Sequence, residues 1–308
     1  MEGTKPKIVV IAGPTASGKT TLGIDLAEAF KGEIVSADSI QIYRYMDVGS
    51  AKPTQEEQSR APHHMIDIRL PDQPYSAGEY MREARQCVDR ILARGKLPLV
   101  VGGTGLYIRA LLRGVVDSAP TDPLVRTRLR NEEHTRGAGT LYSRLTRVDP
   151  DAAATVSPGN LYRIIRALEV VELTGKKMSE LQRDHAFEDR PYRYLFICLE
   201  PERKVLYDRI DKRVDSMING RLLMEVCNLY QLGYSRRLKP LQSLGYRHAG
   251  MVLAGEIGLD EAVKLMKRDT RRYAKRQFTW FRSEPEVVWC DPAQGHGIRF
   301  MIANYLGG

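Results

Sequence analysis

Five short apolar runs along the chain have the length and the branched side chains of buried strands. They span residues 7–12, 33–38, 97–101, 194–199 and 287–290. Unbroken apolar runs of this length are typical of parallel strands that are covered on both faces. Segments with helical spacing lie between them, and this alternation predicts an α/β fold with a parallel sheet and helices on both faces.

Capping residues mark several of the helices between these runs. Apolar positions in residues 21–30 recur at helical intervals directly after the first strand. Ser76 and Glu79 form a capping-box pattern before a helix that we expect to stop at Gly95. Pro201 is expected to open a long helix, and two more helices with the last strand complete the chain.

The strand-like runs are absent between about residues 117 and 190, where helical stretches rich in arginine follow one another. Asp122, Asp149 and Asn160 stand where helix N-caps are expected, and Gly175 stands where the last of these helices would end. The sequence therefore predicts two domains. Residues 1–116 and 191–308 form a core that contains the sheet, and residues 117–190 form a helical insertion domain.

The first strand leads into a complete G-x-x-x-x-G-K-T loop at residues 13–20, and a helix follows it. This order of strand, loop and helix is the context in which the motif binds phosphates. Backbone N–H groups and the helix N-terminus attract an anion, Lys19 adds a full charge, and the Thr20 hydroxyl is a ligand for Mg²⁺. The motif predicts a P-loop NTPase-like core with a diphosphate or nucleotide bound by Gly13, Pro14, Thr15, Ala16, Ser17, Gly18, Lys19 and Thr20.

A carboxylate stands at the end of the second predicted strand, whereas the third has none. The third strand runs into Gly102 and Gly103 without an aspartate. Nucleotide hydrolases usually hold magnesium through an aspartate at that place, so a motor or switch ATPase is disfavoured. Asp38, in contrast, is suited to accept a proton from an incoming nucleophile. The alternative is that Asp38 caps the turn that follows it.

The net charge of the chain says more about its binding partner than its length does. Of the 308 residues, 43% are hydrophobic and 28% are charged, as in ordinary globular proteins. The net charge is +9, and a surface this basic attracts polyanions. Arginine outnumbers lysine by about two to one, and guanidinium groups both bind phosphate and stack on bases. We therefore expect an RNA partner; the alternative is an enzyme that is merely basic.

Targeting and metal-binding patterns are not found. No apolar stretch approaches the ~18 to 20 residues of a membrane span, and no signal-peptide region precedes the first strand. We expect a cytoplasmic protein, a monomer, with no membrane contact. The four cysteines lack zinc-finger spacing and are interpreted as reduced core thiols. His63 and His64 have no third ligand at metal-site spacing, so a local structural role is the favoured interpretation.

Taken together, these motifs resemble one family closely, the tRNA dimethylallyltransferases, also called tRNA isopentenyltransferases. The matching segments span nearly the whole chain in the family's order. They are GPTASGKT at 13–20, SADSIQIY at 36–43, GSAKP at 49–53, PHHMID at 62–67, GGTGLY at 102–107, RALEV at 166–170, GYR at 245–247 and AKRQ at 274–277 with TW at 279–280. The zinc finger that eukaryotic relatives append is not in the sequence, so the resemblance points to the bacterial type.

The resemblance implies a specific reaction. A dimethylallyl group would pass from dimethylallyl diphosphate to the exocyclic N6 amine of the adenine 3′ of the anticodon in tRNA, with release of pyrophosphate. Lys19, Arg213 and a Mg²⁺ ion on Thr20 would stabilise the leaving diphosphate. Asp38 would take or orient the proton of the amine.

The resemblance also implies a surface that holds a splayed anticodon loop, because the target adenine must leave its stack to react. The residues assigned to tRNA in this way are Asp38, Ser39, Ile40, Gln41, Thr104, Arg126, Tyr162, Arg163, Ile164, Ile165, Arg166, Gln242, Ser243, Leu244, Gly245, Tyr246 and Arg247. Tyr162 and His248 depart from the family's usual residues. A basic run at residues 267–276 with neighbouring aromatics is either a further RNA contact or a solvated helix face.

Two other functions remain open from the sequence. A nucleoside or small-metabolite kinase shares the loop, the sheet and an aspartate near the acceptor, but a small acceptor would not require the basic helical insertion. An RNA-binding module with a structural anion in the loop is disfavoured, because Lys19, Thr20 and Asp38 are all present.

Overall fold

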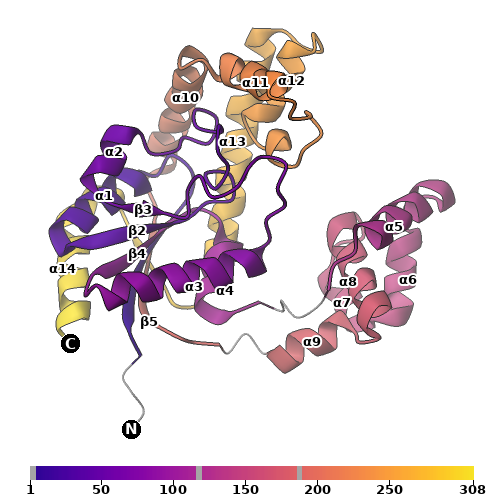
Figure 1. Ribbon diagram of the computed structural model, residues 1–308, viewed down its shortest axis with the longest axis horizontal. Coiled ribbons are helices and arrows are strands. Elements are labelled where there is room, and N and C mark those ends of the chain that lie inside the picture. Colours follow the sequence, from indigo (N-terminus) through magenta and orange to yellow (C-terminus); the bar gives the residue numbers. More distant parts are fainter. Residues whose placement is uncertain (1–4, 116–119, 186–188) are drawn as a thin grey trace. The chain divides into compact units, whose positions relative to one another are not determined.

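The computed structural model describes residues 5–115, 120–185 and 189–308, which belong to two compact units (Figure 1). One unit comprises Met1–Leu112 and Arg190–Gly308, and the other comprises Arg113–Asp189. The boundary predicted at residues 116 and 117 lies outside the described residues. Each unit has its own hydrophobic core, and each is described separately below.

The larger unit contains a six-stranded sheet in the order β3-β2-β4-β1-β5-β6, in which all neighbouring strands are parallel. The strands are β1 (Lys7–Ala12), β2 (Gly32–Ala37), β3 (His63–His64), β4 (Leu97–Gly102), β5 (Arg193–Leu199) and β6 (Val287–Cys290). The five predicted strands and the parallel α/β fold are confirmed. The two-residue edge strand β3 was not predicted, because so short a pairing leaves no apolar run in the sequence.

The sheet buries both of its faces, as the apolar runs require. In β1 the side chains alternate, so that Ile8 and Val10 pack on one side while Val9 and Ile11 pack on the other. Helices α1 and α14 cover the second face, and α3 and α4 cover the first (Figure 1). The helices of this unit are α1 (Lys19–Phe30), α2 (Gln55–Arg60), α3 (Ala77–Ala93), α4 (Gly105–Arg113, which ends at the unit boundary), α10 (Arg203–Asn219), α11 (Leu222–Gln231), α12 (Tyr246–Leu253), α13 (Leu259–Arg282) and α14 (Gly295–Gly307), with short 3₁₀ turns at Pro240–Gln242 and Pro292–Gln294.

Two predictions about the helices of the carboxyl-terminal region are wrong. The expected start of a helix at Pro201 is wrong, since α10 begins at Arg203 after an N-cap at Glu202. The expectation of two further helices is also wrong, because α11, α12 and α13 precede β6 and α14 follows it. Helices of two or three turns such as α11 and α12 gain most of their stability from tertiary packing, which periodicity over so few residues does not reveal.

The parallel register places the functional segments at one edge of the sheet. Ala12 at the end of β1 pairs with Gly102 at the end of β4, and Gly102 pairs with Ala37 at the end of β2. The phosphate loop therefore leaves the sheet at the same level as Asp38 and Gly103. Ligands of open α/β sheets bind beyond the carboxyl ends of the strands, and this edge is the place to look for a site.

The smaller unit is a bundle of short helices around an aliphatic core that includes Leu129, Leu145 and Leu168. Its helices are α5 (Pro123–Arg136), α6 (Thr140–Val148), α7 (Pro150–Thr155), α8 (Leu161–Thr174) and α9 (Met178–His185). The predicted N-caps at Asp122, Asp149 and Asn160 accept hydrogen bonds from backbone N–H groups, and Gly175 ends α8 with a φ of 70°. In the described parts of both units, no helix combines the length and hydropathy that a bilayer crossing requires.

Candidate active site

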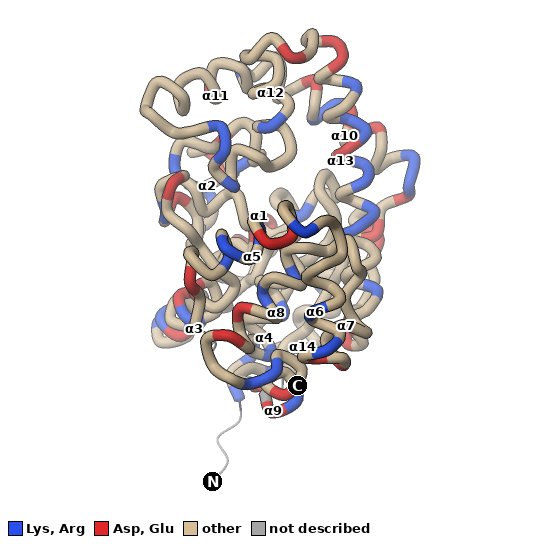
Figure 2. The backbone as a smooth tube through the Cα atoms, turned by 90° about the vertical axis from the view of Figure 1, so that its right-hand side faces the viewer, with Lys and Arg blue, Asp and Glu red and all other residues tan. Residues whose placement is uncertain are grey.

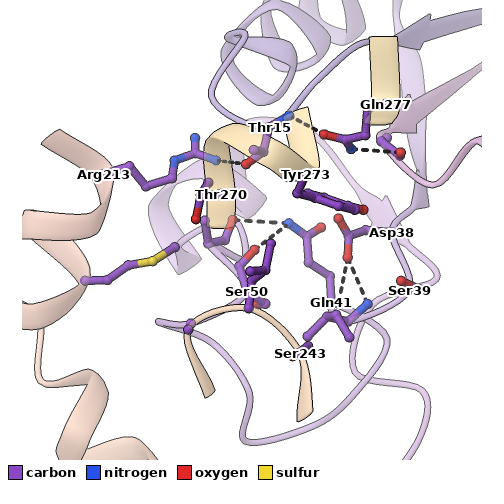
Figure 3. A pocket seen from close by; sticks show the side chains of 18 of the residues that line it. Thr15, Asp38, Ser39, Gln41, Ser50, Arg213, Ser243, Thr270, Tyr273 and Gln277 are labelled. Atoms are coloured by element: carbon purple, nitrogen blue, oxygen red, sulfur yellow. Dashed lines mark hydrogen bonds between the residues drawn. The ribbon is translucent and has the colours of Figure 1, made fainter. Parts of the chain in front are cut away.

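A cavity of about 550 Å³ lies at the carboxyl edge of the sheet in the larger unit (Figure 3). Its walls come from the phosphate loop, the loop after β2, helices α10 and α13, and the turn that precedes α12. We call it the central cavity. Of the residues that the sequence proposed for the site, it brings together Thr15, Lys19, Thr20, Asp38, Ser39, Ile40, Gln41, Arg213, Gln242, Ser243, Leu244, Gly245 and Arg247.

The phosphate loop has the backbone that an anion cradle needs. Gly13 and Gly18 have φ values of 146° and 93°, which other residues rarely adopt, and Ala16 has a φ of 64°. The N–H of Ser17 donates to the Pro14 carbonyl at 3.3 Å and closes the turn. No side chain caps the start of α1 at Gly18, so its first N–H groups are left for a ligand. Gly13, Pro14, Ala16 and Ser17 are buried and shape the loop.

Lys19 lies at the base of the cradle in a setting that weakens its hold on a proton. Its Nζ donates to the Pro14 carbonyl at 2.6 Å. Burial, together with the nearby charge of Arg213, lowers the pKa of Lys19 to about 8. An anion in the cradle favours the charged ammonium and opposes this effect. The arrangement is therefore suited to a strongly charged ligand such as a diphosphate.

Arg213 reaches the same loop from α10. Its Nη1 donates to the Thr15 hydroxyl at 3.2 Å (Figure 3). Burial lowers the pKa of Arg213, although a guanidinium stays charged across the physiological range. Figure 2 shows Lys and Arg along both α10 and α13, which pack against each other. The structure thus places a second cation at the cradle, almost two hundred residues from the motif.

Asp38 follows β2 directly, and its two carboxylate oxygens have different surroundings. Its Oδ1 accepts the N–H groups of Ile40 at 2.8 Å and Gln41 at 3.2 Å, so it caps the turn. No donor among the described residues bonds to Oδ2, and the side chain lines the central cavity. Thr104 lies behind this turn, where its Oγ1 accepts the N–H of Ser39 at 3.0 Å, and it is not part of the cavity wall.

Residues 47–51 form a loop that is held by two polar side chains and contributes to the cavity wall. Gln41 accepts a hydrogen bond from the Ser36 hydroxyl and donates to the Ser50 and Ala51 carbonyls at 3.4 and 3.1 Å (Figure 3). Glu225 of α11 accepts three consecutive backbone N–H groups of residues 47–49 at 2.7 to 3.1 Å. Nothing in the sequence pointed to Glu225, because a lone glutamate on a short helix carries no motif.

Tyr246 was predicted to contact RNA, and this expectation is corrected for its side chain. The ring is fully buried, and its hydroxyl donates to Glu225 at 2.6 Å. Its neighbour Arg247 is exposed, and its Nη2 forms an ion pair with Oδ2 of Asp269 on α13 at 2.9 Å. His248 is buried, and its Nε2 lies 3.3 Å from Oδ2 of the same Asp269. Burial lowers the pKa of this imidazole. The histidine that departs from the family's usual residue is therefore buried inside the fold.

In the smaller unit, the predicted RNA residues of α8 separate into buried and exposed positions. The side chains of Ile164 and Ile165 are 1% and 4% exposed in the core, so their assignment to side-chain contact with RNA is corrected. Tyr162 is 62% exposed, and Arg163 is also exposed. Of the predicted RNA residues on α8, these two are the exposed ones.

Two other predicted RNA residues, Arg126 and Arg166, form ion pairs with the buried Glu169 at 2.8 and 2.7 Å. Burial alone would raise the pKa of Glu169, but the hydrogen bonds from these arginines hold it below the usual range. Both arginines therefore support the fold of the smaller unit.

Helix α13 contributes cavity residues that the sequence analysis did not assign to the site. Thr270, Tyr273 and Gln277 follow one another at helical spacing and line the central cavity (Figure 3). Burial raises the pKa of the Tyr273 phenol, so it remains a neutral ring at the wall. The spacing of three and four residues was visible in the sequence, but only the fold shows which face of the helix points to the site.

Metal-binding groups are sparse in the described parts of the chain, where no cluster of three His, Cys, Asp or Glu residues could hold an ion. His63 and His64 instead bond to the Ala61 carbonyl and the Glu33 carboxylate at 2.8 and 2.7 Å, and all four cysteines are free thiols. Thr20 is a wall residue of the central cavity at the start of α1. A magnesium ion there would need further ligands from the phosphates of a substrate, which is how this ion is commonly held.

Comparisons with known proteins agree closely with one another. A family model described as IPP transferase matches residues 41–284. A tRNA dimethylallyltransferase of Syntrophobacter fumaroxidans is 53% identical over 291 residues, covering 94% of this chain and 85% of that protein. The tRNA dimethylallyltransferase of Desulfosudis oleivorans is 47% identical and covers 98% of this chain and 97% of its own.

Two solved structures are similar over most of their length. The full-length tRNA isopentenylpyrophosphate transferase of Bacillus halodurans has a TM-score of 0.73 and 40% identity, covering 98% of this chain and 97% of that one. A eukaryotic dimethylallyltransferase described as acting on tRNA has a TM-score of 0.78 and 27% identity, covering 94% of this chain and 75% of that one.

Proposed function

This chain belongs to the IPP transferase family, the tRNA dimethylallyltransferases, and on that premise we propose that it transfers a dimethylallyl group from dimethylallyl diphosphate to the N6 amine of the adenine 3′ of the anticodon in tRNA. Pyrophosphate is the second product. The observation that carries this proposal is the position of the phosphate loop and Asp38 on one cavity wall, at the same edge of the sheet. The kinase alternative has no support among the relatives described above.

The phosphate loop acts on the leaving group. The bond between the allylic carbon and the diphosphate oxygen breaks, and negative charge grows on pyrophosphate. The ammonium of Lys19, the guanidinium of Arg213 and the free N–H groups at the start of α1 are the donors directed at this charge. Preorganised donors of this kind stabilise a transition state more than the ground state, because the charge they meet increases during the reaction.

Asp38 acts on the acceptor. The amine nitrogen forms a bond to the allylic carbon and loses a proton, which we propose that Asp38 accepts through Oδ2, since this side chain lines the cavity. Because Oδ1 is fixed by two backbone N–H groups, the carboxylate has a defined direction. An adenine must leave its stack to enter the cavity, and the polar side chains of Ser39 and Gln41 line the space around this carboxylate.

Magnesium is part of the proposal. Thr20 would hold the ion through its hydroxyl together with the diphosphate oxygens, since the described residues offer no carboxylate cluster for an all-protein site. When bound, the ion supplies positive charge that neutralises the leaving pyrophosphate.

The tRNA surface is proposed to use two parts of the chain. In the larger unit, residues 242–245 and Arg247 line the central cavity. In the smaller unit, Tyr162 and Arg163 offer an aromatic ring and a cation.

The experiment that tests this proposal uses unmodified tRNA, Mg²⁺ and dimethylallyl diphosphate with the purified protein. Mass spectrometry of the digested RNA should show one added prenyl group on the adenine 3′ of the anticodon. A matched tRNA with guanine at that position should remain unmodified. Prenylation of the control, or ATP-dependent phosphorylation in place of prenylation, contradicts the proposal.

The lowered pKa of Lys19 predicts how donor binding depends on pH. The ammonium is already charged below its pKa of about 8, whereas above it a proton must be taken up when the anion binds. Affinity for dimethylallyl diphosphate should therefore fall as pH rises above about 8, by up to about tenfold per unit. Calorimetric titration without tRNA measures this. The Lys19→Arg variant keeps its charge and should lose the decline, and an equal decline in both proteins would assign it to another group.

Arg163 predicts a salt effect on tRNA binding. Replacing this exposed cation by glutamine should weaken tRNA binding and reduce the slope of log affinity against log salt by about one, with little effect on folding. Arg166→Gln is the matched comparison, because Arg166 pairs with buried Glu169 and its loss should lower the unfolding temperature. An unchanged salt slope in Arg163→Gln removes this residue from the RNA surface.

A further inference from the structure

Gln277 occupies an unusual place between the phosphate loop and the sheet. It lies near the C-terminal end of α13, five residues before Arg282, and its side chain is almost completely buried. Its Oε1 accepts the N–H of Thr15 at 2.9 Å, and its Nε2 donates to the Gly103 carbonyl at 2.9 Å. Figure 3 shows this amide directed at Thr15 across the top of the central cavity. One amide therefore bridges the loop after β1 and the turn after β4.

The chain leaves room for this bridge at Gly103. A Cβ atom on Gly103 would lie 2.4 Å from the Gln277 nitrogen, so a larger residue would displace the amide. A second glycine, Gly105, has the same relation to Trp280, where a Cβ would lie 2.1 Å from the indole ring. The glycine-rich turn after β4 thus serves close packing against α13.

Thr15 is consequently held from two helices. Gln277 of α13 takes its backbone N–H, and Arg213 of α10 donates to its hydroxyl. The Thr15 N–H is then occupied, and the anion is left to the N–H groups nearer the start of α1. Since Thr15 directly precedes Ala16, where the backbone has a left-handed φ, its position sets where those N–H groups point.

We propose that Gln277 is a positioning residue for prenyl transfer, which fixes the phosphate loop relative to the acceptor side of the cavity. Four residues before it on α13, Tyr273 lines the same cavity, so one rigid helix contacts both the donor cradle and the acceptor space. The inference rests on the proposed function for the identity of the diphosphate. A misplacement of about 1 Å at a reacting centre can lower the rate about 100-fold, so loss of the Gln277 bridge is expected to slow prenyl transfer.

The chemistry of the bridge gives a specific test, because a group that both accepts and donates is needed. In Gln277→Glu, the protonated acid reproduces both bonds: its carbonyl accepts from Thr15, and its hydroxyl donates to Gly103. The ionised carboxylate cannot donate, and it adds negative charge beside the diphosphate cradle. Burial and the acceptor at Gly103 favour the neutral acid, whereas the guanidinium of Arg213 beside Thr15 favours the carboxylate, and the pH dependence of the variant reports the balance.

The experiment measures kcat and KM for dimethylallyl diphosphate in the full-length protein from about pH 6 to pH 8. At each pH, the value for the variant is divided by the value for the wild-type protein. A group common to both proteins, such as Lys19, titrates in each and largely cancels in the ratio. We expect Gln277→Glu to approach wild type at the acid end and to lose about 100-fold in kcat/KM at the alkaline end. The Kd for tRNA should change by less than about twofold.

Two further variants serve as controls. Gln277→Met has a similar size without either bond, so it should be impaired at every pH and show no recovery in acid. Gln86→Glu adds the same charge on the exposed side of α3 and should behave as wild type. Thermal unfolding of each variant reports on folding.

The outcomes separate this inference from the proposed function. If wild type prenylates tRNA but Gln277→Glu and Gln277→Met keep wild-type kinetics at all pH values, the positioning role is wrong and the function stands. Pyrophosphate binding is measured by calorimetry in parallel and needs no tRNA. If wild type does not prenylate tRNA, a loss of pyrophosphate affinity in Gln277→Glu that recovers in acid still supports the role of the bridge.

Discussion

Replacing Asp38 by asparagine should lower the turnover of prenyl transfer by about 10²- to 10⁴-fold, the usual contribution of a positioned general base. The amide oxygen of asparagine can still accept the N–H groups of Ile40 and Gln41, so the turn after β2 is expected to keep its shape. The oxygen facing the cavity becomes an amide nitrogen, which cannot accept a proton. Turnover should therefore fall while the affinities for tRNA and for the donor remain nearly unchanged.

Asp38→Ala provides the comparison. It removes the base and the cap together, and loss of such a cap costs about 1 kcal/mol. We expect both variants to lose turnover to a similar degree, and the alanine variant alone to lose stability. Single-turnover kinetics and thermal unfolding measure the two effects. Wild-type turnover in Asp38→Asn would remove Asp38 from the proton transfer and leave it as a cap.

Arg213→Gln should reduce kcat by about 10²- to 10³-fold, which is typical when one donor to developing negative charge is removed. Arg213 is the cation that α10 supplies to the cradle, and it also holds the Thr15 hydroxyl. Pyrophosphate should bind less tightly to the variant, because this charge meets the leaving group. Quenched-flow measurement of pyrophosphate release gives the rate, and calorimetry gives the affinity.

Lys204→Gln is the matched control for Arg213. It removes one positive charge from the exposed surface of the same helix, outside the central cavity. Its effect on kcat should be below about twofold at physiological salt, because exposed charges are strongly screened. Comparable losses in both variants would mean that the net charge of α10 matters and that the place of Arg213 does not.

The sheet was predictable because its signals are local and strong. Each of the five longer strands is a short apolar run, and the glycines of the phosphate loop stand where the backbone adopts positive φ. Asp38 could be found for the same reason, since the end of a strand is visible in sequence and parallel strands end at one edge. The starts of helices in the smaller unit could be predicted for the same reason, because capping residues are local signals.

Burial of individual side chains was not predictable in this way. Ile164 and Ile165 were grouped with their exposed neighbours, although one face of α8 must pack inward. Tyr246 lies in a segment that lines the cavity, yet its ring is turned into the core toward Glu225. A contiguous stretch of sequence was treated as one surface, whereas a helix distributes its residues over all sides.

Long-range polar contacts were also not predictable from the sequence. Gln277 and Thr15 are 262 positions apart, and Glu225 and Val48 are 177 apart. A backbone N–H has no residue identity, so a side chain that bonds to it leaves no complementary partner in the sequence. The fold is needed to show which glutamine or glutamate bonds to which loop.

The most direct test of the central claim is a single-turnover reaction that counts both products in the absence of any nucleoside triphosphate. With unmodified tRNA, Mg²⁺ and dimethylallyl diphosphate, the account predicts one pyrophosphate released for each prenylated adenine, with both products lost in Asp38→Asn and Arg213→Gln. A requirement for ATP, or binding of ATP at the phosphate loop that dimethylallyl diphosphate cannot displace, would contradict it.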